Sequence, residues 1–240
     1  MLRRVICVVL LTAAPAGAQP ASFVYTLGKD TTAIEQFTRT ATGLTGDMVQ
    51  RNGAAIQRVR YSIVLGKDGR ATSATLQRLT QDGAPAPAPS LTRFTIGKDS
   101  LVREIVFADS TQRRAFAAGL VNWPTFVYGP TELLASLRAK KQVVDSLPAI
   151  GATGNQGFTG FTTVGGDSVR LRGGGYAMVL RFDAQNRLLS VDGSGTTNKV
   201  TATRGGAIDF EALAKAMRPT GVLSLRRSTL LSTTPTTLPP

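Results

Sequence analysis

The side chains that could do acid–base or nucleophilic chemistry here are carboxylates, serines and lysines, because the chain has no histidine and one cysteine. Without histidine there is neither a Ser-His-Asp triad nor an imidazole metal site. The cysteine, Cys7, stands in an apolar N-terminal segment, and residues 19–240 contain none. Thiol catalysis and structural zinc are therefore excluded for that part of the chain.

Carboxylates remain as candidates for catalysis. The chain has only four glutamates, which are Glu35, Glu104, Glu132 and Glu211. Two carboxyl groups that flank a sugar linkage can hydrolyse it, and spacing in the sequence does not exclude that two meet in space. The other hydrolase motifs are missing: Gly-x-Ser-x-Gly is absent, since Ser194 in "VDGSG" has Asp192 and not glycine two residues before it, and Ser-x-x-Lys is absent too. A hydrolase that uses carboxylates alone is thus one hypothesis.

A repeated tetrapeptide resembles a phosphate-binding loop. "LGKD" occurs at 27–30 and 65–68, "IGKD" at 96–99 and "VGGD" at 164–167. A P-loop needs serine or threonine after its lysine, whereas aspartate here would repel phosphate. The sequence also shows no calcium loop of alternating Asp and Asn. We therefore expect no cofactor and no metal, and interpret the tetrapeptides as turns.

The segments around these tetrapeptides alternate apolar and polar residues, which is typical of half-buried strands. "RVRYSIVL" at 58–65 and "YAMVLRF" at 176–182 show the alternation best. Glycine and aspartate between such segments favour tight β-hairpins. We predict ten to twelve strands, with "TNKVTATR" at 197–204 as the strand that closes the sheet.

Two amphipathic segments predict helices near 130–142 and 208–217. The first begins with Pro130 and carries a leucine stripe, and the second has Asp209 as a candidate N-cap and Pro219 at its end. Each stripe is expected to pack on the sheet. The predicted fold class is therefore mainly β, with a single antiparallel curved sheet or open β-barrel and two packed helices, in one domain over 19–218. An irregular tail follows over 219–240.

Residues 1–18 have the layout of a secretory signal peptide. Arg3 and Arg4 precede a short apolar run, and small residues precede Gln19. We expect cleavage before Gln19 and export to the periplasm or the cell exterior. No later segment is long and apolar enough for a transmembrane helix.

The chain is basic, with a formal net charge of +13. The charges are dispersed, without a run of five or six basic residues, so no nucleic-acid-binding patch is expected. An anionic envelope surface is a plausible partner for such a chain.

Three phrases, "YTLGKDTTAIEQFTRT", "YSIVLGKDG" and "LRFDAQNRLLSVDG", together resemble the β-rich module of certain uncharacterised secreted bacterial proteins. In some relatives a similar module precedes an α/β-hydrolase domain. The resemblance covers roughly residues 23–217 and implies an accessory or binding module. It assigns no functional residue.

Two binding functions remain beside the hydrolase. The first is a non-catalytic envelope module that binds a protein or a surface. The second is a carrier of a lipid or other apolar ligand in a cavity of the curved sheet. The alternation places one set of inward side chains as candidate cavity residues: Tyr61, Ile63, Leu65, Tyr176, Met178, Leu180 and Phe182. The alternative is that these side chains simply fill the core, which the pattern favours.

Overall fold

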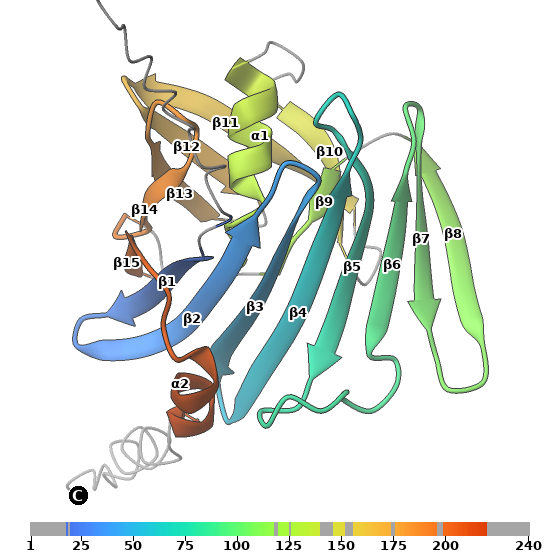
Figure 1. The fold of residues 1–240 in the computed structure, drawn as a ribbon, viewed down its shortest axis with the longest axis horizontal. Coiled ribbons are helices and arrows are strands. Elements are labelled where there is room, and N and C mark those ends of the chain that lie inside the picture. Colours follow the sequence, from blue (N-terminus) through green and yellow to red (C-terminus); the bar gives the residue numbers. More distant parts are fainter. Residues whose placement is uncertain are drawn as a thin grey trace, which may run out of the picture.

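The computed structural model describes residues 18, 20–117, 120–124, 126–139, 146–151, 156–173, 176–195 and 199–219. These residues form one sheet of fifteen strands and two helices (Figure 1). The elements are β1 (Pro20–Leu27), β2 (Asp30–Arg39), β3 (Gly43–Asn52), β4 (Ala55–Leu65), β5 (Ala71–Leu79), β6 (Leu91–Ile96), β7 (Ser100–Val106), β8 (Thr111–Ala117), β9 (Leu120–Asn122), α1 (Thr131–Ala139), β10 (Ser146–Gly151), β11 (Gln156–Gly165), β12 (Ser168–Gly173), β13 (Tyr176–Phe182), β14 (Leu188–Asp192), β15 (Thr201–Gly205) and α2 (Phe210–Ala216).

The sheet consists of two meanders joined through the first and last strands. Its order is β8-β7-β6-β5-β4-β3-β2-β1-β15-β14-β13-β12-β11-β10-β9. All neighbours pair antiparallel except β9 and β10, which are parallel. The predicted fold class is therefore confirmed, and the strand predicted to close the sheet pairs with β1. The free edges of the described sheet are β8 and β9, which are consecutive in the chain.

The four glycine–aspartate tetrapeptides are hairpin turns, as predicted. They connect β1 to β2, β4 to β5, β6 to β7 and β11 to β12, and each connected pair is hydrogen-bonded in antiparallel register. In the first turn Gly28 has φ of 62°, a conformation in which a side chain would be strained. The second turn is closed by the Gly66 N–H, which donates to the Arg70 carbonyl at 2.8 Å.

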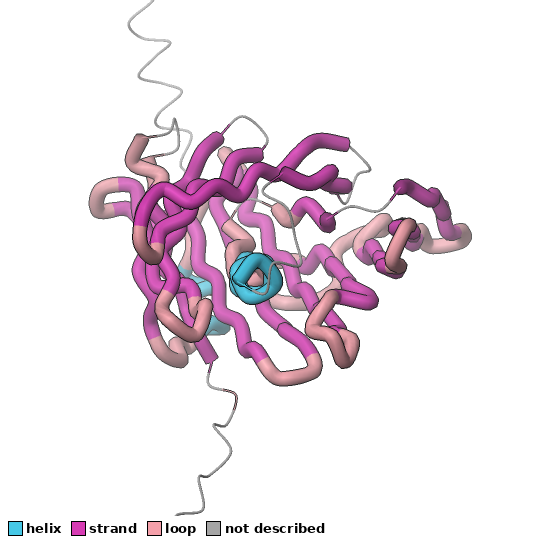
Figure 2. The backbone as a smooth tube through the Cα atoms, turned by 90° about the horizontal axis from the view of Figure 1, so that it is seen from above, coloured by secondary structure: helices cyan, strands magenta, loops and turns pink. Residues whose placement is uncertain are grey.

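The two helices lie on opposite faces of the sheet. Seen from above, α1 lies inside the curve with strands on both sides of it (Figure 2). Its side chains Leu133 and Leu137 are buried, which confirms the predicted apolar stripe. On the outer face, α2 packs Phe210 against Ile34 of β2 and its neighbours. Asp209 caps α2 by accepting from the Ala212 N–H at 3.0 Å.

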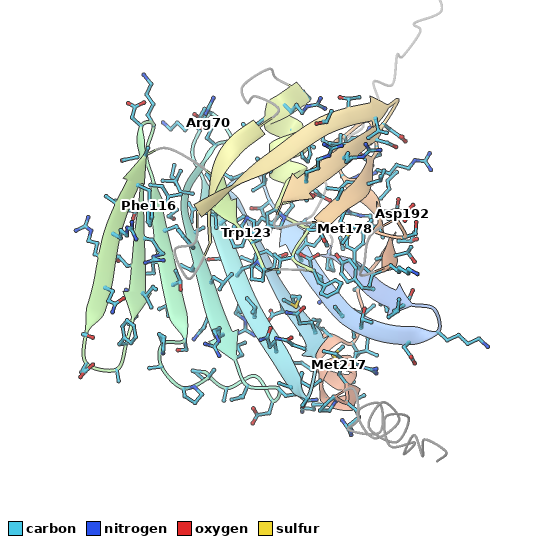
Figure 3. The ribbon with its side chains drawn as sticks, turned by 180° about the vertical axis from the view of Figure 1, so that it is seen from behind. Arg70, Phe116, Trp123, Met178, Asp192 and Met217 are labelled. Atoms are coloured by element: carbon cyan, nitrogen blue, oxygen red, sulfur yellow. The ribbon has the colours of Figure 1, made fainter. Side chains whose placement is uncertain are left out.

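The curvature places the main core between the two meanders and around α1. Phe23 and Tyr61 from the first meander and Met178 and Leu180 from the second are at most 1% exposed and belong to the same apolar cluster. Figure 3 shows Met178 and Trp123 in the middle of the molecule, away from Phe116 on the outlying strands.

Some predictions fall outside the described residues. The signal peptide lies there apart from residue 18, as does the tail after residue 219. Neither of the two described helices has the length and apolar character that a membrane span requires.

Candidate functional site

One segment inside the sheet, residues 126–139, is held there by a buried carboxylate. We call this segment the plug. Glu35 points inward from β2 and is completely buried. Its Oε1 accepts from the Gly129 N–H at 2.9 Å and from the Tyr61 hydroxyl at 2.6 Å. Its Oε2 accepts from the Tyr128 N–H at 3.1 Å and from the Tyr25 hydroxyl at 3.0 Å. The plug is thus fastened through its own backbone.

Burial decides how Glu35 titrates. Loss of hydration raises the pKa of this carboxyl from 4.5 to about 7, although the four hydrogen bonds favour the charged form and act against the shift. Burial and the nearby Glu35 also raise the pKa values of Tyr25 and Tyr61 well above the usual range. The tyrosines therefore remain hydrogen-bond donors. The backbone approaches closely here, because a Cβ on Gly129 would lie 2.8 Å from both Phe37 and the Tyr61 hydroxyl.

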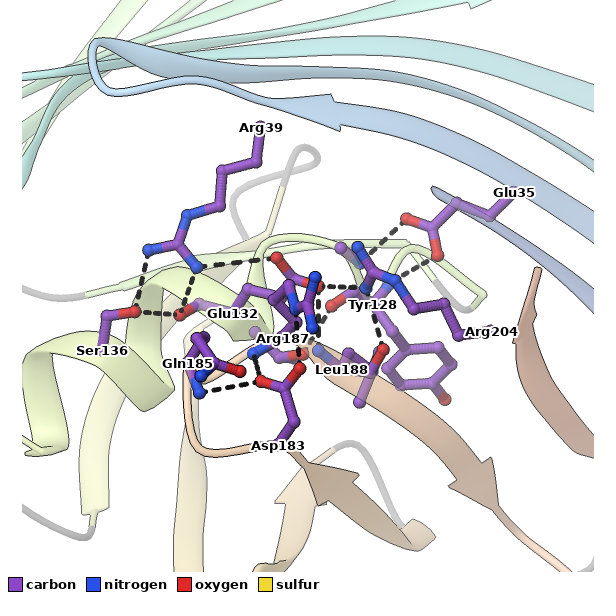
Figure 4. A network of polar contacts seen from close by, with 12 residues as sticks. Glu35, Arg39, Tyr128, Glu132, Ser136, Asp183, Gln185, Arg187, Leu188 and Arg204 are labelled. Carbon is purple, nitrogen blue, oxygen red and sulfur yellow. Dashed lines mark hydrogen bonds and ion pairs between the residues drawn. The ribbon is translucent and has the colours of Figure 1, made fainter. Parts of the chain in front are cut away.

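A second buried carboxylate, Glu132 of α1, connects the plug to both meanders (Figure 4). Its Oε1 accepts from Arg204 of β15 at 2.6 Å and from the Leu188 N–H of β14 at 2.8 Å. Its Oε2 lies 3.5 Å from Arg39 of β2. Arg39 also donates to Ser136 on the next turn of α1, at 2.8 Å. One side chain thereby links strands from both halves of the sheet.

These two glutamates are buried and satisfied by the chain's own donors. Both are at most 1% exposed, and neither lines either of the two cavities described below. The other glutamates are held by arginines, Glu104 by Arg113 at 3.7 Å and Glu211 by Arg58. The geometry of the four glutamates thus gives no support to a hydrolase that uses them. The described residues also contain no group of three potential metal ligands from His, Cys, Asp and Glu.

A groove of about 760 Å³ opens between α1 and the second meander. Phe161 of β11, Val169 of β12 and Phe182 of β13 supply its apolar lining, and Ala135 and Ala139 of α1 form the opposite side. These alanines leave room that a larger residue would fill. The groove is therefore a concave, partly aromatic surface of the size that small-molecule sites have.

The charged groups at the groove are already paired. Arg138 lies 5.8 Å from the ring centre of Phe161 and donates to Thr163. The hydrogen bond from Arg181 holds the pKa of Asp167 below its usual value. Burial raises the pKa of Asp183, but hydrogen bonds from Arg187 and Gln185 outweigh it and the net shift is downward. A general acid needs a raised pKa, so these two aspartates are poorly suited to acid catalysis.

A smaller hollow of about 370 Å³ lies over β2–β5 and is lined mainly by polar side chains. Gly46 lies in its floor, and a Cβ there would lie 2.5 Å from the Tyr61 ring, so the glycine makes room for that ring. Threonine and serine from neighbouring strands, Thr45, Ser62 and Thr75, line it side by side. The hollow is less than half the volume of the groove beside α1 and lacks its aromatic lining.

The predicted cavity residues come together around the plug. Tyr61, Ile63, Met178, Leu180 and Phe182 are buried in the main core cluster, and Leu65 packs against it. Tyr176 begins β13, and its side chain lies outside the described part. Only Phe182 of this set lines the groove, while Tyr61 lines the smaller hollow. The prediction that the seven residues bind a ligand stays a prediction.

Sequence reasoning missed the two buried glutamates as anchors. The sequence did contain an indication of the burial of Glu35. In "TAIEQFTRT" it alternates with Ala33 and Phe37, so in a strand its side chain lies on the same inward face as theirs. Glu132 had none, because an acidic residue in the first turn of a helix is common on exposed helices. The groove residues Ala135 and Ala139 had no signal either.

Comparisons with known proteins do not assign the chain to a family. No protein-family model matches it, and no curated protein matches it. A crystal structure of a DUF1089 family protein from Pseudomonas aeruginosa is similar over 67% of this chain and 89% of that chain, with 10% identity and a TM-score of 0.43. A β-barrel-like protein of the domain of unknown function DUF1849 from Brucella abortus is similar over 79% and 95%, with 10% identity and a TM-score of 0.45. At these values neither similarity indicates a function, and neither bears on the α/β-hydrolase relationship.

Proposed function

We propose that this protein is an exported, non-catalytic binding module that holds an apolar or amphiphilic small molecule in the groove between α1 and β11–β13. The observation that carries the proposal is the groove itself, with its volume of about 760 Å³ and its lining by Phe161, Val169 and Phe182. Ligand sites of this size are typically lined by apolar and aromatic side chains with a few polar groups at their margin.

The position of the groove also supports this function. The plug fills the centre of the curved sheet, so a ligand there would have to break the hydrogen bonds from the plug backbone to Glu35 and those that Glu132 accepts from both meanders. The groove needs no such change, because one of its sides is the outward part of α1 around Ala139, which is exposed. A ligand can therefore enter beside the plug while the plug stays anchored.

Filling the groove tests the proposal. Ala139→Trp places an indole in the groove from an exposed position, and Ala212→Trp on α2 is the matched control at an exposed position on the other face. We expect residues 19–240 to bind the neutral dye N-phenyl-1-naphthylamine with enhanced fluorescence. Ala139→Trp should weaken binding about tenfold, which is roughly 1.4 kcal/mol, and Ala212→Trp should leave it unchanged. Equal binding by both variants would reject the groove as the site.

A protein partner is the second candidate, because β8 is at one edge of the sheet that the described residues form, and Thr111–Ala115 are exposed on it. An exposed strand edge can pair with a strand of another protein. Native mass spectrometry of the protein isolated from its own periplasm separates the two candidates. A small-molecule adduct supports the groove ligand, a protein-sized adduct supports the edge, and a bare mass that stays bare with added lipid counts against a carrier.

A further inference from the structure

Two arginines lie side by side on the inner face of the outlying strands. Arg103 of β7 and Arg114 of β8 are direct partners in the antiparallel register, so their side chains leave the sheet on the same face. Their guanidinium carbons lie 5.7 and 5.1 Å from the ring centre of Phe116. We call these three residues the arginine cluster, and Figure 3 shows Phe116 at its position on the outlying strands.

Arg103 is buried without a counter-charge. It is 6% exposed, and its Nε and Nη1 have no hydrogen-bond partner. No carboxylate among the described residues forms an ion pair with it. Burial, followed by the charge of Arg114, lowers the pKa of Arg103. The N–H groups of buried guanidinium groups normally donate to carboxylates or carbonyls. The unpartnered Nε and Nη1 of Arg103 are therefore an exception that needs a physical explanation.

The nearest acid in the sequence does not relieve this charge. Glu104 follows Arg103 in β7 and therefore points to the opposite face, where it pairs with Arg113 at 3.7 Å. The cross-strand neighbour of Arg103 on its other side is Phe94 of β6, which is 1% exposed. The arginine cluster thus combines two cations and an aromatic ring next to an apolar surface.

We propose that Arg103 and Arg114 together bind one anionic group, a phosphate or a carboxylate. Such a group accepts hydrogen bonds from two guanidinium forks and cancels the repulsion between them. Arg114 is exposed and can close over the bound group, while Arg103 is fixed by its burial. The site involves β7 and β8, whereas the groove beside α1 involves β11–β13, so this proposal stands independently of the proposed function.

Thermal unfolding of residues 19–240 tests the site. The probes are inorganic phosphate and dodecyl phosphate, each compared with sodium chloride at equal ionic strength. A ligand that binds only the folded state at a hundredfold excess over its dissociation constant should raise Tm by about 5–10 °C. An equal response to both phosphates indicates a free anion as the ligand. A dodecyl phosphate response at tenfold lower concentration indicates the head group of an amphiphile.

Two variants and one control separate binding from general salt effects. Arg103→Leu removes a buried, unpaired cation, so we expect its Tm without phosphate to exceed that of the parent chain by about 2–4 °C. It should show no specific phosphate response. Arg114→Gln, at an exposed position, should keep the fold and weaken phosphate binding at least tenfold. Arg113→Gln, on the other face of the same strand, should respond like the parent chain.

Two results would overturn the proposal. One is a phosphate response of the parent chain no larger than that of Arg103→Leu, because the effect would then be general stabilisation by an excluded salt. The other is an Arg103→Leu variant that is less stable than the parent chain without phosphate, because Arg103 would then be a satisfied structural residue.

Discussion

Buried charge is handled in opposite ways in two regions of this molecule. At the plug, Glu35 and Glu132 are at most 1% exposed, and their carboxylate oxygens accept hydrogen bonds or ion pairs from four and three groups respectively. In the arginine cluster, Arg103 is nearly as buried, yet two of its three nitrogens have no partner. Its nearest charged neighbour in the register, Arg114, has the same sign.

The buried charges of the plug serve the folded structure itself, whereas the buried charge of the arginine cluster depends on a ligand for its partners. Where the chain supplies all the partners of a buried charge, the charge is part of the folded structure. Removing one of those partners then lowers the free energy of unfolding. A buried charge without partners costs stability until something outside the chain supplies them. Mutations should therefore act with opposite sign in the two regions.

The largest effect is expected at Glu132. Glu132→Ala removes the buried carboxylate that Arg204, Arg39 and the Leu188 N–H share, so the free energy of unfolding should fall by about 3–5 kcal/mol. Urea unfolding can be followed by the fluorescence of the single tryptophan, Trp123, whose ring centre lies 5.6 Å from that of Tyr61 beside the plug.

Glu104→Ala is the control, because Glu104 forms a partly exposed ion pair with Arg113. Its cost should stay below about 1 kcal/mol. If the two variants lost equal stability, Glu132 would not be an anchor and the contrast between the two regions would disappear.

The second effect is a pH dependence that Glu35 imposes. In the folded state its pKa is about 7, against an ordinary value of 4.5, so between these values the folded chain binds a proton that the unfolded chain lacks. The stabilisation is complete below about pH 4.5 and is lost as the pH rises through 7. From pH 5 to pH 8 the free energy of unfolding should fall by roughly 2–3 kcal/mol.

Glu35→Gln sharpens this prediction, because the chain contains no histidine that would titrate in the same window. The variant should show a nearly flat profile from pH 5 to pH 8. At pH 5 it should be less stable than the parent chain by about 1–3 kcal/mol, since its amide nitrogen meets a backbone N–H at Tyr128 or Gly129 that cannot accept. An unchanged slope would assign the pH dependence to other groups.

The smallest expected effect is the coupling free energy between Arg103 and Arg114. A double-mutant cycle with Arg103→Leu and Arg114→Gln, in buffer without phosphate, should give a repulsive coupling of about 0.5 kcal/mol. The same cycle in saturating phosphate should give an attractive coupling, because the anion then joins the two side chains. A coupling that is attractive in both buffers would mean that the pair is satisfied without a ligand.

Local patterns in the sequence predicted the parts of the fold that depend on local physics. Alternation located the strands around Tyr61 and Met178, and the glycine–aspartate turns located the hairpins, because both depend only on neighbouring residues. The cap of α2 at Asp209 is local in the same sense.

The rest depends on long-range pairing, which alternation does not specify. We predicted ten to twelve strands, whereas the described residues form fifteen, and the short strands β9 and β10 include glycine, proline and asparagine. These residues have little strand propensity of their own, so their neighbours determine their conformation. The groove and the arginine cluster could not be predicted either, because each joins side chains from several strands.

The pairing of β1 with β15 has a consequence for how the chain folds. Phe23 and Arg204 face each other in the register, so most of the polypeptide lies in the loop that this contact closes. Contacts of such long sequence separation slow folding, because the entropy of closing the loop is lost before the contact stabilises anything. In a circular permutant that opens between β8 and β9 and joins the native ends, β1 would follow β15 in the sequence. The pairing of these two strands would then join segments that are close in the chain. The permutant should therefore reach the same sheet faster.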